Sequence, residues 1–289
     1  MPLDLVVNVA VGGVLTGLVY GLMALGLSVI YGVVRIVNFA HGEMMTVAMY
    51  GAVLLYTRLG LDPLLMIVPV GMALFLAGYA IQSVLINPFI NRPEHVQFML
   101  VIGIAIIIAN GLLIGFGPDA RNAPVSYAMD SFSLGPLLLD KVRVYAAGGA
   151  FVVAALLFGF FRHARTGKAI RACADNYVGA RVVGLDVKRL YALTFGIGTA
   201  CVGAAGSMLA LLVDVTPSLG PSYTLLAFVI VIVGGLGSMA GALFGGVLIG
   251  LSEALAGLFF APSAKSMFSF AILILLLLFR PQGLFGRRA

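Results

Sequence analysis

The sequence predicts an all-α polytopic membrane protein, and three of its features support this fold class. The chain of 289 residues is 62% hydrophobic and only 10% charged, with a mean hydropathy of +1.13, whereas soluble domains carry about 25% charged residues. Runs without Asp, Glu, Lys or Arg, such as 5–34 and 215–252, exceed the roughly 20 apolar residues that a helix needs to cross a bilayer. The strict alternation expected of membrane β-strands is not the dominant pattern. We therefore treat residues 1–289 as a single transmembrane domain.

The chain divides into about eight membrane segments. Each is an apolar run separated from the next by charged residues or by Gly and Pro. In order, the segments are 5–33, 41–57, 63–87, 95–117, 144–161, 190–213, 222–258 and 264–280.

The distribution of Lys and Arg predicts the orientation. Loop 162–189 carries seven of the 17 cationic residues, and cytoplasmic loops are enriched in Lys and Arg. With this loop inside, alternate crossings place Arg35, Arg92 and the arginines at the C-terminus inside as well, and the N-terminus outside. Only five cations then lie outside: Arg58, Arg121, Lys141, Arg143 and Lys265.

This orientation requires region 222–258 to enter the membrane from outside and to return there. A break at Gly234-Gly235-Leu236-Gly237-Ser238 allows that path. The first limb, 222–233, has about 12 residues and would be about 18 Å long as a helix, which is too short to cross. We therefore expect a broken or re-entrant hairpin near 234–238, buried in protein or lining a cavity.

The first half of the chain contains a comparable interruption at 36–44, between segments 5–33 and 41–57. In both halves the interrupted hairpin is followed by a segment that runs inward, 63–87 or 264–280. This order suggests an internal duplication, as in transporters built from two related halves. The alternative is a chance match between low-complexity apolar segments.

Loop 118–143 is the longest predicted outer segment. The stretch Val125–Leu134 alternates polar and apolar residues between prolines, which is typical of a short β-hairpin. The alternative interpretation is a simple connector.

Polar residues inside the membrane mark two candidate sites. Asn38, His41 and Glu43 lie together at the interruption of the first hairpin, and Glu253 lies in the second limb of the other hairpin. Ionisable residues within the membrane indicate a functional site, so these side chains are candidates for the translocation pathway. The structural alternative is that they satisfy hydrogen bonds at the break. His41 and Glu43 do not form a zinc signature, because a third ligand at suitable spacing is missing.

The sequence of loop 162–189 predicts two short helices, about 168–175 and 177–183. Gly184 is suited to end the second helix, and Asp186 is suited to cap the next one. The charged, amphipathic loop fits a docking surface for a cytoplasmic partner. Its alternative is an interfacial helix that rests on anionic lipid headgroups.

The sequence carries no nucleotide site of its own. Gly167-Lys168 resembles the end of a P-loop, but Ala169 replaces the required Ser or Thr. Energy for pumping must therefore come from a partner or an ion gradient. A dense basic tract with interleaved aromatic residues is absent, which argues against nucleic-acid binding.

Several blocks of sequence resemble the branched-chain amino acid ABC transporter permease family, specifically its LivH branch. Loop Gly167–Asp186 is similar to the ATPase-docking loop of that family, although Ala172-Cys173-Ala174-Asp175 followed by Gly179 departs from the Glu-Ala-Ala…Gly pattern of classical importers. The blocks that carry the resemblance are Gly17–Leu27, Ile36–Glu43, Gly234–Ala242 and Arg280–Gly286.

The resemblance implies a permease subunit in the bacterial inner membrane, without a cofactor. It implies two cytoplasmic ATP-binding subunits, a second homologous permease and an extracytoplasmic substrate-binding protein as partners, besides membrane lipid. The docking residues it implies are Ala174, Asp175, Gly179, Arg181 and Gly184.

Three other functions stay open on the sequence. The same family includes permeases for urea and short amides. A self-contained channel or ion-coupled carrier would use His41, Glu43 or Glu253 as its ion site. A membrane-embedded enzyme would need a clustered nucleophile and base or a metal site, and the three histidines, His41, His95 and His163, are not clustered.

Overall fold

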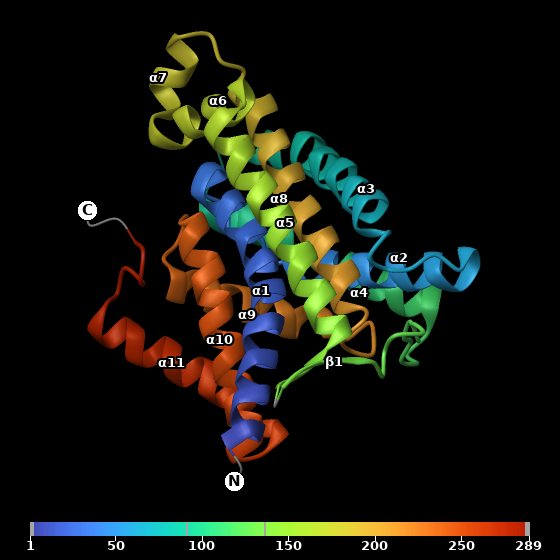
Figure 1. The fold of residues 1–289 in the computed structure, drawn as a ribbon. Coiled ribbons are helices and arrows are strands. Elements are labelled where there is room, and N and C mark those ends of the chain that lie inside the picture. The colour runs from blue at the N-terminus through green and yellow to red at the C-terminus, as the bar shows by residue number, and fades with distance from the viewer. Residues whose placement is uncertain (1–2, 91, 136, 287–289) are drawn as a thin grey trace.

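The computed structural model describes residues 3–90, 92–135 and 137–286, and these fold into eleven α-helices and one β-hairpin (Figure 1). Arg287 and Arg288, predicted to lie inside, fall outside the described residues. The α-helices are α1 (Leu3–Val34), α2 (His41–Leu59), α3 (Ile67–Ala80), α4 (Glu94–Phe116), α5 (Lys141–His163), α6 (Arg165–Asp175), α7 (Tyr177–Val182), α8 (Val187–Leu209), α9 (Leu219–Gly234), α10 (Met239–Phe259) and α11 (Lys265–Phe279). The short elements are the π-helix η1 (Ile81–Ile86), the 3-10 helices η2 (Asn87–Phe89) and η3 (Pro262–Ala264), and the strands β1 (Ser131–Leu134) and β2 (Leu137–Asp140).

Six helical segments of the described chain are long and apolar enough to cross a membrane. They are α1, α3 together with η1 and η2, α4, α5, α8 and α10. The all-α polytopic fold class is therefore confirmed, whereas the predicted count of about eight segments is not. The helices α9 and α11 are apolar but shorter, with 16 and 15 residues, and α9 is only about 24 Å long.

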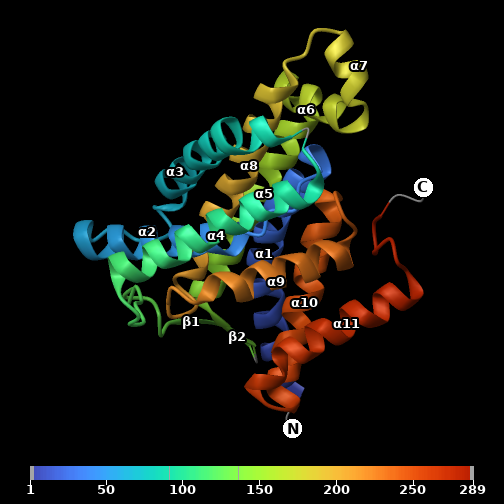
Figure 2. The ribbon, with the colours of Figure 1, turned by 180° about the vertical axis from the view of Figure 1, so that it is seen from behind.

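Helix α1 is the central element of the fold, with α10 and α8 packed along it (Figures 1 and 2). Glycines allow the close approach of α10: a Cβ on Gly17 would lie 2.7 Å from the carbonyl oxygen of Gly246. The crossing with α8 is similar, since a Cβ on Gly198 would lie 2.7 Å from the Gly26 carbonyl. Such small-residue contacts are typical of helix packing in membranes.

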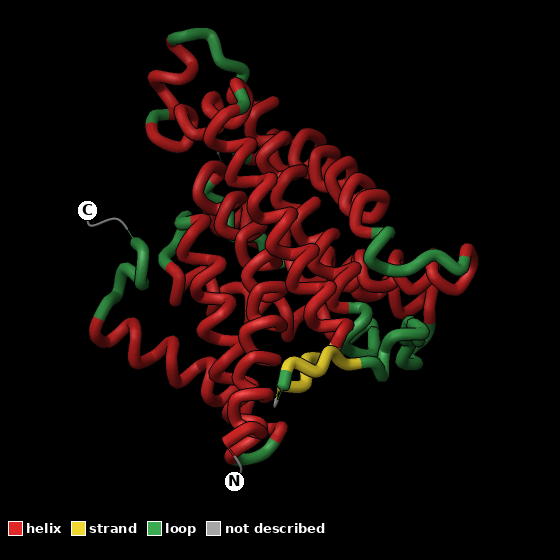
Figure 3. The backbone as a smooth tube through the Cα atoms, in the orientation of Figure 1, coloured by secondary structure: helices red, strands yellow, loops and turns green. Residues whose placement is uncertain are grey.

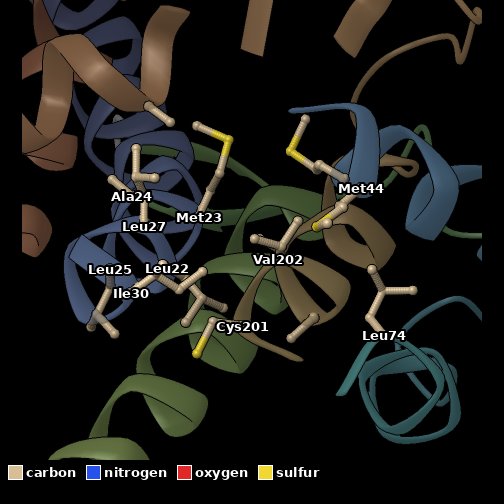
Figure 4. Close-up of a cluster of buried hydrophobic side chains, with 14 of the residues drawn as sticks. Leu22, Met23, Ala24, Leu25, Leu27, Ile30, Met44, Leu74, Cys201 and Val202 are labelled. Atoms are coloured by element: carbon tan, nitrogen blue, oxygen red, sulfur yellow. The ribbon is translucent and has the colours of Figure 1, made fainter. Parts of the chain in front are cut away.

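The buried core lies along the middle of α1 and α8, and α2 and α3 add side chains to it (Figure 4). Leu22 and Ile30 of α1 and Val202 of α8 are fully enclosed, and Met44 and Leu74 bring α2 and α3 to the same cluster. The core therefore joins the first half of the chain to the second half.

The predicted break between α9 and α10 is present. Gly235 and Gly237 have φ angles of 103° and 79°, which glycine adopts far more readily than other residues. Gly234 and Gly235 are buried, but Leu236 and Gly237 are exposed on the chain. The break is therefore buried in protein in its first half, whereas Gly237, in its second half, lies against Gly32 close to the end of α1.

The C-terminal segment covers the first half of this break. The backbone N–H groups of Leu284 and Phe285 donate to the carbonyls of Val233 and Gly234, at 2.9 and 3.0 Å. Phe285 also stacks on Phe244 of α10, with 5.2 Å between ring centroids. These bonds satisfy carbonyl groups at the end of α9, which would otherwise lack partners.

The outer loop contains the predicted β-hairpin, and it lies later in the chain than expected, with only β1 inside the stretch Val125–Leu134. Strands β1 and β2 pair antiparallel from Ser131–Asp140 to Leu134–Leu137 (Figure 3). Gly135, at φ 63°, makes the turn between them. The stretch 125–130 forms two hydrogen-bonded turns instead of a strand, so the hairpin begins only at Ser131.

The proposed internal duplication stays a prediction. It would pair α1 with α9 and α2 with α10. Helices α1 and α9 differ twofold in length, with 32 and 16 residues, whereas α2 and α10 are similar, with 19 and 21 residues.

Candidate functional site

The interruption between α1 and α2 is a compact polar turn. Arg35, which follows α1, has a φ angle of 61°, a left-handed conformation that is uncommon outside glycine. Asn38 is fully buried, and its Oδ1 accepts a hydrogen bond of 3.1 Å from the N–H of Ala40. This side chain replaces the helical hydrogen bonds that the interruption removes, so that α2 can begin at His41.

His41 ties the start of α2 to the middle of α1. Its side chain is fully buried, and its Nε2 lies 3.0 Å from the carbonyl oxygen of Met23. The carbonyl can only accept, so Nε2 carries a proton and donates it to this bond. Among the described residues, Nδ1 has no hydrogen-bond partner.

Glu43 and Thr224 join α2 to α9. The Thr224 hydroxyl accepts from the N–H of Gly42 at 2.8 Å and lies 3.2 Å from Oε2 of Glu43, to which it can donate. A Cβ on Gly42 would overlap the carbonyl oxygen of Gly220, and a Cβ on Gly220 would lie 2.9 Å from Cγ of Glu43. The two glycines thus allow the backbones of α2 and α9 to meet and let the Glu43 carboxyl reach Thr224.

Asn38, His41 and Glu43 therefore form one cluster, which we call the α2 start cluster. All three side chains are buried, and their described hydrogen bonds are made within the chain, to α1, α2, α9 and the turn itself. In this conformation the cluster fixes where α2 begins and how it crosses α9.

Glu253 lies in a different place, on α10 where α11 packs against it. Its Oε1 accepts a hydrogen bond of 2.8 Å from the hydroxyl of Ser269, and the side chain is only partly buried. Tyr223 of α9 lies close enough to interact with it electrostatically, and Tyr223 also makes an edge contact with Tyr20 of α1, at 6.5 Å between ring centroids. Polar groups from four helices thus meet around Glu253.

The predicted cytoplasmic loop contains the helices α6 and α7, which project from the end of the molecule opposite the N-terminus (Figure 1). Helix α6 buries Gly167, Ile170 and Cys173, which lie three residues apart and so share one face. A Cβ on Gly167 would overlap the carbonyl oxygen of Phe160, so this glycine lets α6 fold back onto α5. Ala174 is partly buried and Asp175 is exposed.

Helix α7 presents an exposed surface that we call the α7 tip, made of Tyr177, Val178, Arg181, Val182 and Val183. Val182 is 81% exposed and Val183 75%. The guanidinium of Arg181 donates to the Tyr177 hydroxyl at 3.0 Å and lies over its ring. A patch of apolar side chains around one ordered cation is typical of a protein-binding surface.

The ends of α7 are as predicted. Gly184 follows α7 with a φ angle of 83°, and Asp186 caps α8 by accepting from the N–H of Arg189 at 3.2 Å. Asn176 was not predicted, and it caps α7 by accepting from the N–H of Gly179 at 2.8 Å. An Asn before a helical run is a preferred cap, so this signal was present in the sequence.

Two partners of the α2 start cluster were also missed. Thr224 and Gly220 lie about 180 residues away from Glu43 in the chain. A single Thr in an apolar helix is common and carries no sign of its partner. Among the described residues, no group of three or more His, Cys, Asp or Glu is placed to hold a metal ion.

Comparison with known proteins decides the family. The family model described as branched-chain amino acid transport system / permease component matches residues 9–277. The chain belongs to this permease family. It is 30% identical to the high-affinity branched-chain amino acid transport system permease protein BraD of Pseudomonas aeruginosa, over 96% of this chain and 94% of that protein. It is 32% identical to the corresponding LivH protein of Escherichia coli K12, over 95% and 94%. No solved structure matches the chain.

The family and the six apolar helical segments together identify a multi-pass protein of the bacterial inner membrane. Its relatives are transport permeases, and the resemblance noted in the sequence is confirmed. Membership in this family accounts for the absence of a P-loop in the chain, because a permease relies on other proteins for ATP binding.

Proposed function

We propose that the chain is the permease subunit of an ATP-driven importer of branched-chain amino acids. The observation that carries the proposal is the α7 tip, an exposed apolar surface at the end of a membrane protein that has no nucleotide site of its own. The substrate class is taken from the relatives, which are named as branched-chain amino acid permeases.

Two cytoplasmic ATP-binding subunits and a second homologous permease would complete the membrane complex. The α7 tip and its neighbours Ala174, Asp175, Gly179 and Gly184 form the surface on which an ATP-binding subunit docks. This assignment is supported by the caps at Asn176 and Asp186, which hold α7 and the start of α8 in a fixed position. A rigid surface transmits the movement of its partner with little loss.

The opposite face of the molecule is suited to an extracytoplasmic substrate-binding protein. Loop 118–143 is tied to three other segments: Tyr56 donates to the Pro124 carbonyl at 2.6 Å, Tyr127 to Asp62 at 2.5 Å, and the Asn8 side chain accepts from the N–H of Leu138 at 2.8 Å. Burial and the bond to Asp62 raise the pKa of the Tyr127 hydroxyl, so it stays a donor at neutral pH. The outer face is therefore preorganised.

For the pathway itself we propose two separate roles. Asn38, His41 and Glu43 brace the start of α2, since they bond to the Ala40 N–H, the Met23 carbonyl and the Thr224 hydroxyl. Glu253, which is partly exposed, and Gly237, which is exposed, lie nearer the surface at which a second permease would complete a path for the solute, and the buried Gly234 and Gly235 form the break that brings Gly237 there.

The docking assignment is tested by Arg181→Glu. This change reverses the charge of the α7 tip and removes the contact with Tyr177, so we expect copurification of the ATP-binding subunits to fall about tenfold, which corresponds to about 1.4 kcal/mol. Leucine uptake should fall with it. Met129→Glu, a control at a side chain that is 98% exposed in the outer loop, should leave copurification unchanged. Normal copurification and uptake in Arg181→Glu would contradict the assignment.

The alternatives are separated by the purified chain in liposomes. An ion-coupled carrier or a channel would support uptake alone, whereas a permease subunit would not. With the full complex, competition of labelled leucine by unlabelled isoleucine and valine, but not by urea or acetamide, would support the substrate class.

A further inference from the structure

The one π-helical segment of the described residues, η1 (Ile81–Ile86), directly continues α3. The N–H of Asn87 donates to the carbonyl of Gln82, five residues earlier, which is the π-helical pattern. Such segments are rare and occur frequently at functional sites. In the predicted orientation this one lies at the cytoplasmic end of α3.

The π-helical turn positions two buried amide side chains. Gln82 is fully buried and Asn87 nearly so. Nε2 of Gln82 donates to Oδ1 of Asn87 at 3.0 Å, and Nδ2 of Asn87 donates to the backbone carbonyl of Lys188 at 3.2 Å. The two residues are thus joined twice, by a backbone and a side-chain hydrogen bond, and together they reach α8.

The bond to the Lys188 carbonyl fixes the orientation of both amide groups. A carbonyl oxygen can only accept, so Asn87 must present its NH2 group to Lys188. Its Oδ1 then faces Gln82, which must in turn present its own NH2 group. Oε1 of Gln82 points away from Asn87, and it has no hydrogen-bond partner among the described residues although it is buried. A buried acceptor without a partner destabilises the conformation in which it lies.

Lys188 connects this network to the docking helices. It is the second residue of α8, two residues after the cap Asp186 and six after the end of α7. Deeper in the membrane α3 and α8 are joined again, where the Thr199 hydroxyl donates to the Leu74 carbonyl at 2.8 Å and lies against Gly78. The start of α8 therefore cannot shift without pulling on the end of α3.

We propose that the Gln82–Asn87 amide pair is a positioning link that carries the movement of α6 and α7, through the start of α8, into α3. It couples ATP hydrolysis to transport, and so it rests on the proposed function. The unpaired Gln82 acceptor fits this role, because a shift of the π-helical turn that gives it a donor would stabilise a second conformation of the same segment.

The test uses the full complex with its ATP-binding and substrate-binding subunits, reconstituted into proteoliposomes. The readout is the number of ATP molecules hydrolysed per leucine transported. Gln82→Leu keeps the volume of the side chain and removes its bond to Asn87, so we expect this ratio to rise about fivefold or more, within the range of typical coupling effects, while the ATP-binding subunits still copurify. Ser83→Ala, which removes a bond to the Ala80 carbonyl within the same turn, is the matched control and should leave the ratio unchanged.

A merely structural role predicts a different result, since hydrolysis and transport would then fall together at a constant ratio. Gln82→Asn keeps an amide in the cavity but is too short to reach Asn87, and it tests the link if Gln82→Leu does not assemble. An unchanged ratio in the assembled variants would overturn the link. Failure of the wild-type chain to bind ATP-binding subunits would instead overturn the proposed function.

Discussion

At the scale of single residues, Cys173 shows how burial controls chemistry in the docking loop. Its side chain lies on the buried face of α6, and burial raises the pKa of the thiol. A raised pKa leaves less of the reactive thiolate at neutral pH. We therefore expect iodoacetamide to alkylate Cys173 slowly at pH 7–8. The rate should rise only at a more alkaline pH than the rate for an exposed cysteine does.

The measurement compares two chains that both carry Cys201→Ala. One retains Cys173, and the other carries Cys173→Ala with Ala172→Cys, which places the thiol on the exposed side of the same helix. Equal rates at pH 7.5 would show that the buried face of α6 is open in solution.

The sequence predicted the candidate residues better than their contacts. Asn38, His41 and Glu43 stand out because polar groups are rare in an apolar background. Their partners do not stand out: the Met23 carbonyl is a backbone group, and Thr224 is remote in the chain. Hydrogen bonds between distant helices depend on how the helices cross, and no local pattern encodes that crossing.

At the scale of elements, the junction of the C-terminal segment with the α9–α10 break provides a direct test of packing. Gly283 has a φ angle of 79°, and a Cβ there would lie 2.6 Å from the backbone of Gly235. Gly283→Ala should destabilise the protein by about 1–2 kcal/mol because alanine is strained at this positive φ angle. Overpacking against Gly235 should add about 1–3 kcal/mol. Thermal unfolding in detergent measures the change.

Gly60→Ala is the matched control for this change. Gly60 has a similar φ angle of 66° but no atom within 4 Å of an added Cβ. Alanine there should therefore show only the cost of the positive φ angle. Equal shifts of the unfolding midpoint in the two variants would mean that the C-terminal segment does not rest on the break.

The boundaries of most helices followed from charge-free runs and from Gly and Pro, because lipid requires long apolar helices. The sequence also located the break at 234–238. It misplaced the β-hairpin, since the turn depends on Gly135 and on local hydrogen bonds at 125–130. It gave no sign that residues 284–285 cover the break, because a backbone contact leaves no pattern in the side chains.

At the scale of the whole molecule, the two ends differ in charge and in the partners proposed for them. We expect Met129→Cys, in the outer loop, to react with a membrane-impermeant maleimide in intact spheroplasts. Val178→Cys, on α7, should react only after permeabilisation, because the excess of Lys and Arg predicts that this end lies inside. Both positions are highly exposed, and both native cysteines are buried. The reverse labelling pattern would mean that the chain is inserted the other way round.

The glycine contacts between α1 and α10 have a consequence for how this chain can vary. At Gly17 and Gly21 of α1, and at Gly246 and Gly250 of α10, an added Cβ would press first on backbone atoms, and at Gly13 it would press on the Ala254 Cβ and the Gly250 carbonyl, which are equally fixed. Backbone cannot rotate aside, so even alanine strains these sites, whereas Gly103 and Gly111 on α4 have open space around them. In a library that samples every substitution, the positions that accept only glycine should recur every four residues on α1 and α10. The pattern of tolerated substitutions would then mark the line along which the two helices touch.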